Sequence, residues 1–179
     1  MKRRQRRIKM GDPKIIALSG AHGTGKTTAV FELAAELKKS QLSEVCIIPE
    51  IARICPYPIF SKDTISSKEA QIWMFSAQMQ AEMDASRRYD IVISDRTIVD
   101  VIAYAAAAGM YDLAFAMKAM AKNYAKSAYK EVFFRSIVDY DFQVDDGSRE
   151  MGHALRKEVE LALLSLYSEL GIQLNYGKG

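Results

Sequence analysis

The feature that most constrains this chain is a glycine-rich octet between a short apolar run and an amphipathic stretch. Residues 20–27 read G-A-H-G-T-G-K-T, which fits the pattern G-x-x-x-x-G-K-[ST]. Residues 15–19, just before the octet, are apolar and too few for a helix, so they predict a buried strand. After the octet, Val30, Leu33 and Leu37 repeat at helical spacing. A strand, a glycine-rich turn and a helix in this order predict a loop whose backbone N–H groups surround an anion.

Such a loop is the phosphate-binding loop, or P-loop, and the motif gives each position an expected role. The glycines let the backbone bend around the β-phosphate of a nucleotide. Lys26 is expected to bridge the β- and γ-phosphates, and the Thr27 hydroxyl to ligate Mg²⁺. The expected ATP-binding residues are Gly20, Ala21, His22, Gly23, Thr24, Gly25, Lys26, Thr27 and Thr28. The motif therefore predicts binding of ATP as its magnesium complex.

The rest of the chain alternates short apolar runs with helical patterns. Four further runs predict strands, at residues 45–48, 91–94, 130–137 and 172–174. Strands that alternate with helices form right-handed crossovers and a parallel sheet covered on both faces. The sequence thus predicts an α/β fold with three layers, in which helices flank a parallel sheet of about five strands.

The longest helical pattern follows a proline-containing loop. Ser66 and Glu69 have capping-box spacing and predict its start. Its expected apolar face consists of Ile72, Phe75, Met79 and Met83. Two glycines follow later helical patterns, Gly109 and Gly171, and are expected to end those helices in a left-handed conformation.

Length and charge predict one domain with a basic arm. A chain of 179 residues fits one domain, which we place at residues 14–179. Six of the 25 basic residues lie within the first nine positions, so residues 1–13 are interpreted as a flexible, solvated arm. Contact of this arm with nucleic acid is the alternative interpretation, and the rest of the chain gives no other sign of nucleic-acid binding.

Composition favours a cytoplasmic protein. No apolar segment reaches the roughly 18 to 20 residues that span a bilayer, so we expect no membrane partner. Cys46 and Cys55 lack the spacing of a metal site and are expected to be free thiols in a reducing compartment. No pattern in the sequence indicates an oligomeric state.

The acid at the end of the third predicted strand separates the classes of P-loop protein. Asp95 follows the apolar run and takes the place of the Walker B acid, which holds Mg²⁺ directly or through water. The next residue is Arg96, where a motor ATPase usually carries a water-activating glutamate. The D-x-x-G and N-K-x-D motifs of a GTPase do not occur in suitable places. A kinase is therefore favoured.

Four segments together resemble the P-loop kinase group, with the nicotinamide riboside kinase-like ATPase domains as the nearest likeness. These segments are the G-A-H-G-T-G-K-T-T loop, residues 49–53, residues 95–97 and residues 146–149. Glu50 resembles the glutamate that deoxynucleoside kinases carry after their second strand. Asp95, Arg96, Ala103 and Tyr104 fit the thymidylate kinase pattern D-R-Y-x-x-S-x-x-A-Y-Q, whose Tyr, Ser and Gln are replaced here.

The candidate acceptor site consists of residues that follow the second and third strands. Glu50 would lie at the carboxyl end of its strand, where a carboxylate can orient or deprotonate an acceptor hydroxyl, and Arg53 would hold the acceptor. Arg96, Asp100 and Tyr104 are four residues apart, so we expect them on one helix face as a substrate wall.

The polar segment before the last helix is where P-loop kinases resemble one another in carrying a lid. Arg149 in this segment is expected to supply positive charge to the transferring phosphoryl group, with Arg156 as a second candidate. Gln71, Gln78 and Gln80 can read a base edge, although exposed helix positions are the commoner place for glutamine.

Two hypotheses of function follow. In the first, Lys26, Glu50, Asp95 and Arg149 transfer the γ-phosphoryl group of MgATP to a nucleoside, a nucleotide or a related metabolite. In the second, the chain is a nucleotide-dependent regulatory protein that hydrolyses ATP slowly and interacts with a partner, because the same loop serves both classes.

Overall fold

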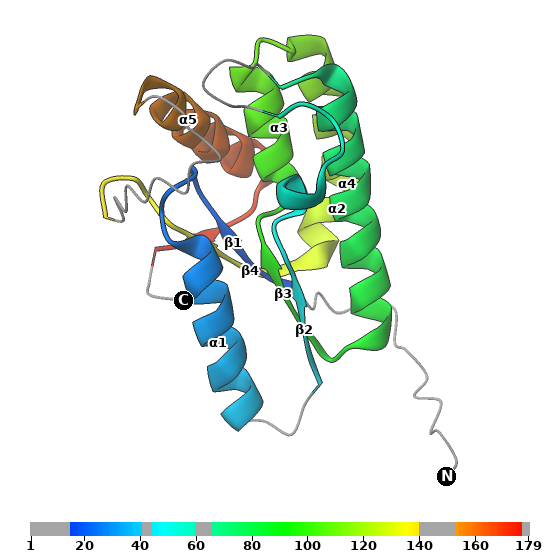
Figure 1. Ribbon diagram of the computed structural model, residues 1–179, viewed down its shortest axis with the longest axis vertical. Helices are drawn as coiled ribbons and strands as arrows, with labels where there is room; N and C mark the ends of the chain where they lie inside the picture. Colours follow the sequence, from blue (N-terminus) through cyan, green and yellow to red (C-terminus); the bar gives the residue numbers. More distant parts are fainter. Residues whose placement is uncertain (1–14, 41–43, 60–65, 140–152, 177–179) are drawn as a thin grey trace.

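The computed structural model describes residues 15–40, 44–59, 66–139 and 153–176 (Figure 1). The strands are β1 (Ile15–Ser19), β2 (Val45–Ile48), β3 (Ile91–Asp95), β4 (Tyr129–Phe134) and β5 (Leu174–Asn175). The helices are α1 (Lys26–Ser40), the short 3₁₀ helix η1 (Ile51–Ile54), α2 (Lys68–Arg88), α3 (Ile98–Ala107), α4 (Tyr111–Ala128) and α5 (His153–Leu170).

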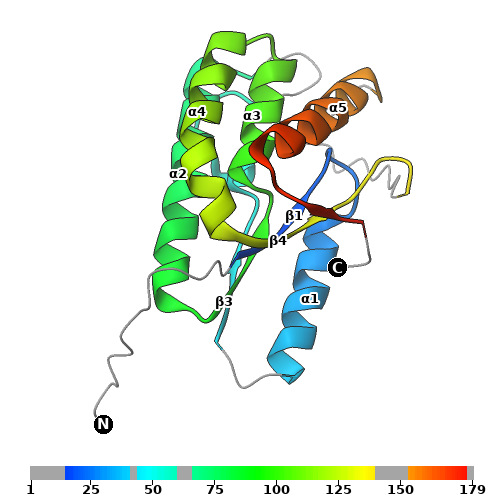
Figure 2. The ribbon, with the colours of Figure 1, turned by 180° about the vertical axis from the view of Figure 1, so that it is seen from behind.

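The strands form one parallel sheet in the order β2-β3-β1-β4-β5. Figures 1 and 2 show α1 on one face of this sheet and α2, α3 and α4 on the other, with α5 beside α3. The predicted three-layer α/β fold is confirmed. In the part of the chain that the structure describes, no helix combines the length and the apolar character needed to cross a membrane.

Each face of the sheet packs against its own apolar core because strand side chains alternate in direction. Ala17 and Val92 contribute to the larger core under α2, α3, α4 and α5. Leu18 and Ile93, one position later on each strand, pack under α1. Since β1 and β3 are covered on both faces, their near-continuous apolar character is what a central parallel strand requires.

The strand register brings four segments to one edge of the sheet. Leu18 of β1 pairs with Asp95 of β3, and Ser19 pairs with Phe134 of β4. Ile48 of β2 pairs with Ser94. The residues that follow these strands therefore meet at the carboxyl edge, where open α/β sheets bind their ligands.

The predicted element boundaries are correct for β1 and β2, whereas the start of α2 and the end of the fourth strand differ from the prediction. The cap of α2 is Ser67, whose Oγ accepts from the Ala70 N–H, whereas Ser66 is buried. The fourth strand ends at Phe134 and not at residue 137, because Arg135 already turns toward the loop after β1. Gly109 and Gly171 do end their helices at positive φ.

The predicted apolar face of α2 is confirmed at Phe75 and Met79, which pack in or against the core, and is wrong at its other two positions. Ile72 and Met83 are about half exposed, whereas Gln71, Gln78 and Glu82 are buried with Phe75. Helical periodicity identifies which residues share a face, but apolarity alone cannot show that a polar side chain has partners in the core.

Glu82 is the most unusual member of this buried set because it forms no ion pair with any residue in the described part of the chain. Its carboxylate accepts hydrogen bonds from Gln78 Nε2 at 2.8 Å and from the hydroxyls of Tyr124 and Tyr129 at 3.0 Å. Burial raises the pKa of Glu82 to about 7, and these hydrogen bonds offset only part of the effect. The charged form of Glu82 therefore destabilises the fold relative to its neutral form.

Replacing Glu82 by Gln should change how stability depends on pH. A carboxyl whose folded-state pKa lies above its unfolded value contributes stability at low pH and loses it as pH rises through the folded pKa. The free energy of unfolding of Glu82→Gln should therefore rise relative to wild type between about pH 4.5 and pH 7, by on the order of 3 kcal/mol. Urea unfolding monitored by circular dichroism across this range measures the difference.

Glu169→Gln on the surface of α5 serves as the control. Hydrogen bonds from Lys118 and Ser165 lower the pKa of Glu169, so its removal should act weakly and in the opposite direction. A stability difference between Glu82→Gln and wild type that does not change with pH would contradict the raised pKa of the buried Glu82 carboxyl.

Candidate functional site

The loop between β1 and α1 depends on three glycines at positive φ. Gly20, Gly23 and Gly25 have φ values of 142°, 72° and 69°. A methyl group on Gly20 would overlap the backbone carbonyl oxygen of Arg135, which follows the neighbouring strand β4. The loop thus needs glycine for its backbone angles and, at Gly20, for close contact with the next strand.

Lys26 begins α1 and lies under the loop instead of extending into solvent. Its Nζ donates to the Ala21 carbonyl oxygen and to Thr24 Oγ1, the latter at 3.0 Å. Burial lowers the pKa of Lys26 to about 7, and the nearby charge of Arg96 acts in the same direction. A bound anion beside this amine would favour its charged form, which is the environment that a phosphate provides.

Thr27 and Asp95 lie together at the base of the cleft. The Thr27 hydroxyl donates to Asp95 Oδ2 at 2.6 Å, although 68 residues separate them in the sequence. Burial raises the pKa of the Asp95 carboxyl, and the hydrogen bond from Thr27 and the charge of Arg96 oppose this rise. Both groups offer hard oxygen donors, the type of ligand that Mg²⁺ takes.

The donor set fits Mg²⁺ bound together with a nucleotide. Among the described residues, no group of three or more His, Cys, Asp or Glu side chains could hold a metal by itself. Mg²⁺ usually keeps several waters and takes only one or two protein oxygens beside substrate phosphates. Thr27 and Asp95, next to the loop that would hold those phosphates, supply these two oxygens.

A cleft of about 650 Å³ opens above the loop. This volume lies within the roughly 300 to 1,000 Å³ of typical ligand pockets. Its walls include the loop, Lys26, Thr27, Glu50, Asp95 and Arg135. The cleft therefore brings the ends of β1, β2, β3 and β4 around one space.

Glu50 follows β2 and forms two ion pairs at the edge of this cleft. Its Oε1 lies 2.8 Å from Arg96 Nε, and its Oε2 lies 3.0 Å from Arg53 Nε. The Glu50 side chain is buried, whereas that of Arg53 is 54% exposed. Arg96 is thus the fixed partner of Glu50, and Arg53 the one that solvent can reach.

Arg96 occupies a strained turn between β3 and α3. It is the only non-glycine residue at positive φ in the described part of the chain, with φ 89°. Its Nη1 donates to the Gly20 carbonyl oxygen at 3.2 Å and lies 3.5 Å from Asp100 Oδ1. The guanidinium also lies over the Tyr104 ring, 5.2 Å from its centroid. Arg96 therefore connects the loop, the end of β2 and helix α3.

Asp100 and Tyr104 lie on one face of α3 as predicted, but this face is buried. Asp100 completes a capping box with Thr97 and accepts a hydrogen bond from Ser19 Oγ at 2.9 Å. The Tyr104 hydroxyl accepts from the His22 backbone N–H at 3.1 Å. Both side chains thus hold the loop after β1 against the start of α3.

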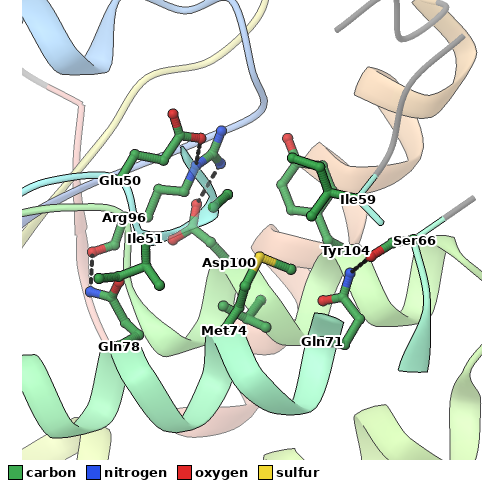
Figure 3. Close-up of a pocket in the computed structure, with 12 residues that line it drawn as sticks. Glu50, Ile51, Ile59, Ser66, Gln71, Met74, Gln78, Arg96, Asp100 and Tyr104 are labelled. Carbon is green, nitrogen blue, oxygen red and sulfur yellow. Dashed lines mark hydrogen bonds and ion pairs between the residues drawn. The ribbon is translucent and has the colours of Figure 1, made fainter. Parts of the chain in front are cut away.

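A second cavity lies on the other side of the Glu50–Arg96 pair, between η1, α2 and α3 (Figure 3). Ile51, Met74 and Tyr104 give it a largely apolar lining. Its volume is about 50 Å³, so its walls must move apart before a nucleoside-sized molecule can enter. Glu50 and Arg96 line both cavities and separate them.

Gln71 supplies an unused acceptor in the second cavity. Its Nε2 donates to Ser66 Oγ at 2.7 Å, whereas its Oε1 is buried without a hydrogen-bond partner in the described structure. A buried amide oxygen without a donor is costly unless a ligand or water satisfies it. The position of Gln71 in the cavity fits the sequence-based interpretation of this residue as one that can read a base edge.

The structure brings most of the predicted site residues together. Loop residues 22–28, Glu50, Arg53, Asp95 and Arg96 line the cleft, and Asp100 and Tyr104 line the second cavity. Arg149 lies outside the described residues, as does the arm at residues 1–13. Arg156 is buried on α5.

Sequence reasoning missed Arg135. Its Nε donates to the Thr24 carbonyl oxygen at 2.7 Å, and its side chain lines the cleft. The sequence pattern placed Arg135 inside a strand predicted to reach residue 137. Its charge, directly after an apolar run, is the signal that could have identified it as a residue at the carboxyl edge of the sheet.

Comparisons with known proteins agree with this geometry. A family model described as "AAA domain" matches residues 15–176. No protein of curated function matches the sequence. Among solved structures, a NadR protein in complex with NR is similar with a TM-score of 0.68 and 21% identity, over 93% of this chain and 46% of that chain. This chain therefore spans about half the length of that NadR protein.

Two kinases resemble this chain over most of their own length. The thymidylate kinase from Ehrlichia chaffeensis has a TM-score of 0.62 and 16% identity, over 92% of this chain and 87% of the kinase. The deoxyadenosine kinase from M. mycoides, solved with the products dCMP and dCDP, has a TM-score of 0.63 and 18% identity, over 90% and 87%. At these identities the likeness shows a shared P-loop kinase-like fold, as predicted.

Gly20→Ala should destabilise the protein by at least about 2 kcal/mol, because it combines an unfavourable positive φ with an overlap against backbone. Gly109→Ala is the matched control: its φ is also positive, but no atom lies within 4 Å of the added methyl group, so it should cost about 1 kcal/mol. Chemical denaturation measures both values. Equal losses in the two variants would show that the contact with Arg135 contributes nothing.

Proposed function

The chain belongs to the AAA domain family, and from this premise we propose that it transfers the γ-phosphoryl group of MgATP to a small nucleoside-like acceptor. The observation that carries the proposal is the pair of adjoining cavities. Glu50 and Arg96 line both of them, one beside the glycine-rich loop and the other under η1. A phosphotransferase needs two substrate sites that meet at the transferring group, whereas a hydrolase needs only one beside its water.

In this proposal the cleft holds MgATP. The loop amides and Lys26 bind the phosphates, and Thr27 and Asp95 hold the metal ion, which neutralises charge that develops on the phosphoryl oxygens. Arg135 adds a positive charge at the same cleft. Arg149 keeps its predicted role as a charge donor to the transferring group.

The second cavity is the proposed acceptor site. Its apolar walls suit a planar ring, and the unused Gln71 Oε1 suits an N–H donor on that ring. Glu50 at the junction orients or deprotonates an acceptor hydroxyl. The Arg53 side chain beside Glu50 is half exposed, so its guanidinium can bind the phosphate of an acceptor that already carries one.

A slow regulatory ATPase is the competing function, and the residue after Asp95 argues against it. The Arg96 guanidinium stays protonated beside Glu50 and Asp100, so it cannot act as the base that would activate water. Product analysis separates the two functions: the protein is incubated with MgATP and a panel of nucleosides and nucleoside monophosphates. ATP loss without any phosphorylated acceptor would refute the kinase proposal.

Lys26→Ala and Asp95→Asn should separate nucleotide binding from metal placement. Lys26→Ala removes a charged hydrogen-bond donor and should weaken ATP binding by about 10- to 100-fold, the equivalent of about 1.5–3 kcal/mol. Asp95→Asn should lower turnover by a similar factor, mainly by misplacing the Mg²⁺ ion and weakening its binding. Calorimetric titration with and without Mg²⁺, beside steady-state kinetics, measures both effects.

Lys122→Ala, an exposed position on α4, is the control for loss of a lysine and should bind ATP like wild type. ATP binding by Lys26→Ala at wild-type strength would contradict the assignment of the loop as the phosphate site.

Glu50→Gln tests the acceptor. If Glu50 deprotonates a hydroxyl, this variant should keep the ATP affinity and lose about 100-fold in transfer rate. Glu44→Gln, exposed before β2, controls for the loss of an acid near this strand. Full transfer by Glu50→Gln would exclude a base role and favour a nucleoside monophosphate, whose phosphate oxygen is already a competent nucleophile.

A further inference from the structure

Two polar side chains of α2, Gln78 and Glu82, are buried beneath the site, and the proposed reaction uses neither. Gln78 is 2% exposed and Glu82 is fully buried. Burial of polar groups is unfavourable unless hydrogen bonds compensate. The partners of these two residues therefore show what they hold in place.

The amide of Gln78 contacts both residues that flank Asp95. Gln78 Nε2 donates to Ser94 Oγ at 2.9 Å and lies 3.4 Å from the Arg96 carbonyl oxygen. Figure 3 shows Gln78 pointing from α2 toward Arg96. The residue before Asp95 and the residue after it are thus held by one side chain.

The turn that Gln78 contacts needs such support. Arg96 has φ 89°, and a non-glycine residue keeps such an angle only when the surrounding structure fixes it. A change of backbone angle at Arg96 would move the Asp95 carboxylate away from Thr27, its partner at 2.6 Å. It would also move the Arg96 guanidinium away from Glu50.

Glu82 holds Gln78 from the core side. Its Oε1 lies 2.8 Å from Gln78 Nε2, one helical turn away on α2. The Tyr129 hydroxyl donates to Glu82 and accepts from the Ile98 backbone N–H at 3.0 Å, at the first residue of α3. The same network therefore contacts the β3–α3 turn at both of its ends.

We propose that Gln78, oriented by Glu82, is a positioning residue that sets Asp95 and Arg96 for Mg²⁺ and phosphate. This inference rests on the proposed binding of MgATP in the cleft. Gln78 lines the second cavity, but its amide nitrogen is directed at the turn. Glu82 lines neither cavity, so any effect of Glu82 on the site passes through the β3–α3 turn, which it reaches by way of Gln78 and Tyr129.

The test measures Mg²⁺-dependent binding of the non-hydrolysable ATP analogue AMP-PNP to the full chain by calorimetry. Gln78→Met keeps the length of the side chain and removes its donors. Glu82→Met removes the acceptor that orients Gln78. Each variant should lower the apparent Mg²⁺ affinity by about tenfold, because partners that orient a metal ligand typically contribute 10- to 100-fold.

Two further variants separate positioning from general stability. Glu82→Gln keeps a carbonyl oxygen for Gln78 and should restore the Mg²⁺ affinity to within about twofold of wild type. The double variant Gln78→Met/Glu82→Met should bind Mg²⁺ no more weakly than either single variant, because both substitutions act on the same turn. A merely structural role would lower the melting temperature without changing the Mg²⁺ affinity of the folded protein.

Unchanged Mg²⁺ affinity in folded Gln78→Met and Glu82→Met would overturn the proposal. So would a Gln78→Met variant that changes only acceptor binding, since Gln78 would then be a substrate contact. If Gln78→Met does not fold, Gln78→Asn replaces it, because the shorter amide cannot reach both Ser94 and Arg96. Wild-type protein that fails to bind Mg²⁺–AMP-PNP would instead refute the proposed function, before any variant is compared.

Discussion

The site depends on the ion pairs and hydrogen bonds that the buried guanidinium of Arg96 forms. This guanidinium joins Glu50 after β2, the Gly20 carbonyl in the loop after β1 and Asp100 in α3. A charge in this position is tolerable only because carboxylates and a carbonyl surround it, and removal of one partner would leave the others uncompensated. The three strand ends therefore keep one arrangement, and the strained turn at Arg96 persists because these contacts fix it.

The same arrangement separates the nucleotide cleft from the second cavity. Because Glu50 and Arg96 line both, a group bound in one cavity lies beside the charges that face the other. Transfer of a phosphoryl group is catalysed mainly by positioning and electrostatic stabilisation, so a rigid, charged boundary between two sites is a suitable geometry for it. The small volume of the second cavity implies that acceptor binding would be coupled to movement of its walls.

The fold by itself does not select an acceptor. A thymidylate kinase and a deoxyadenosine kinase share this architecture at 16% and 18% identity. The sheet edge and the glycine-rich loop are common requirements of nucleotide binding, whereas in the proposed function side chains such as Gln71 and Met74 would choose the acceptor. Under that proposal, the chemistry of those cavity residues would set the specificity for the acceptor.

The sequence by itself determined the features that depend on local order along the chain. The octet at residues 20–27, the strand before it and the helix after it follow from glycine angles and short-range periodicity, and the alternation of patterns determined the parallel sheet. Tertiary structure decided which polar residues become buried. Gln78 and Glu82 have the sequence signature of an exposed helix face, and Arg96 and Glu50 lie 46 residues apart. A polar side chain can be buried only where partners from distant segments satisfy its hydrogen bonds, and those partners are in place only after the chain has folded.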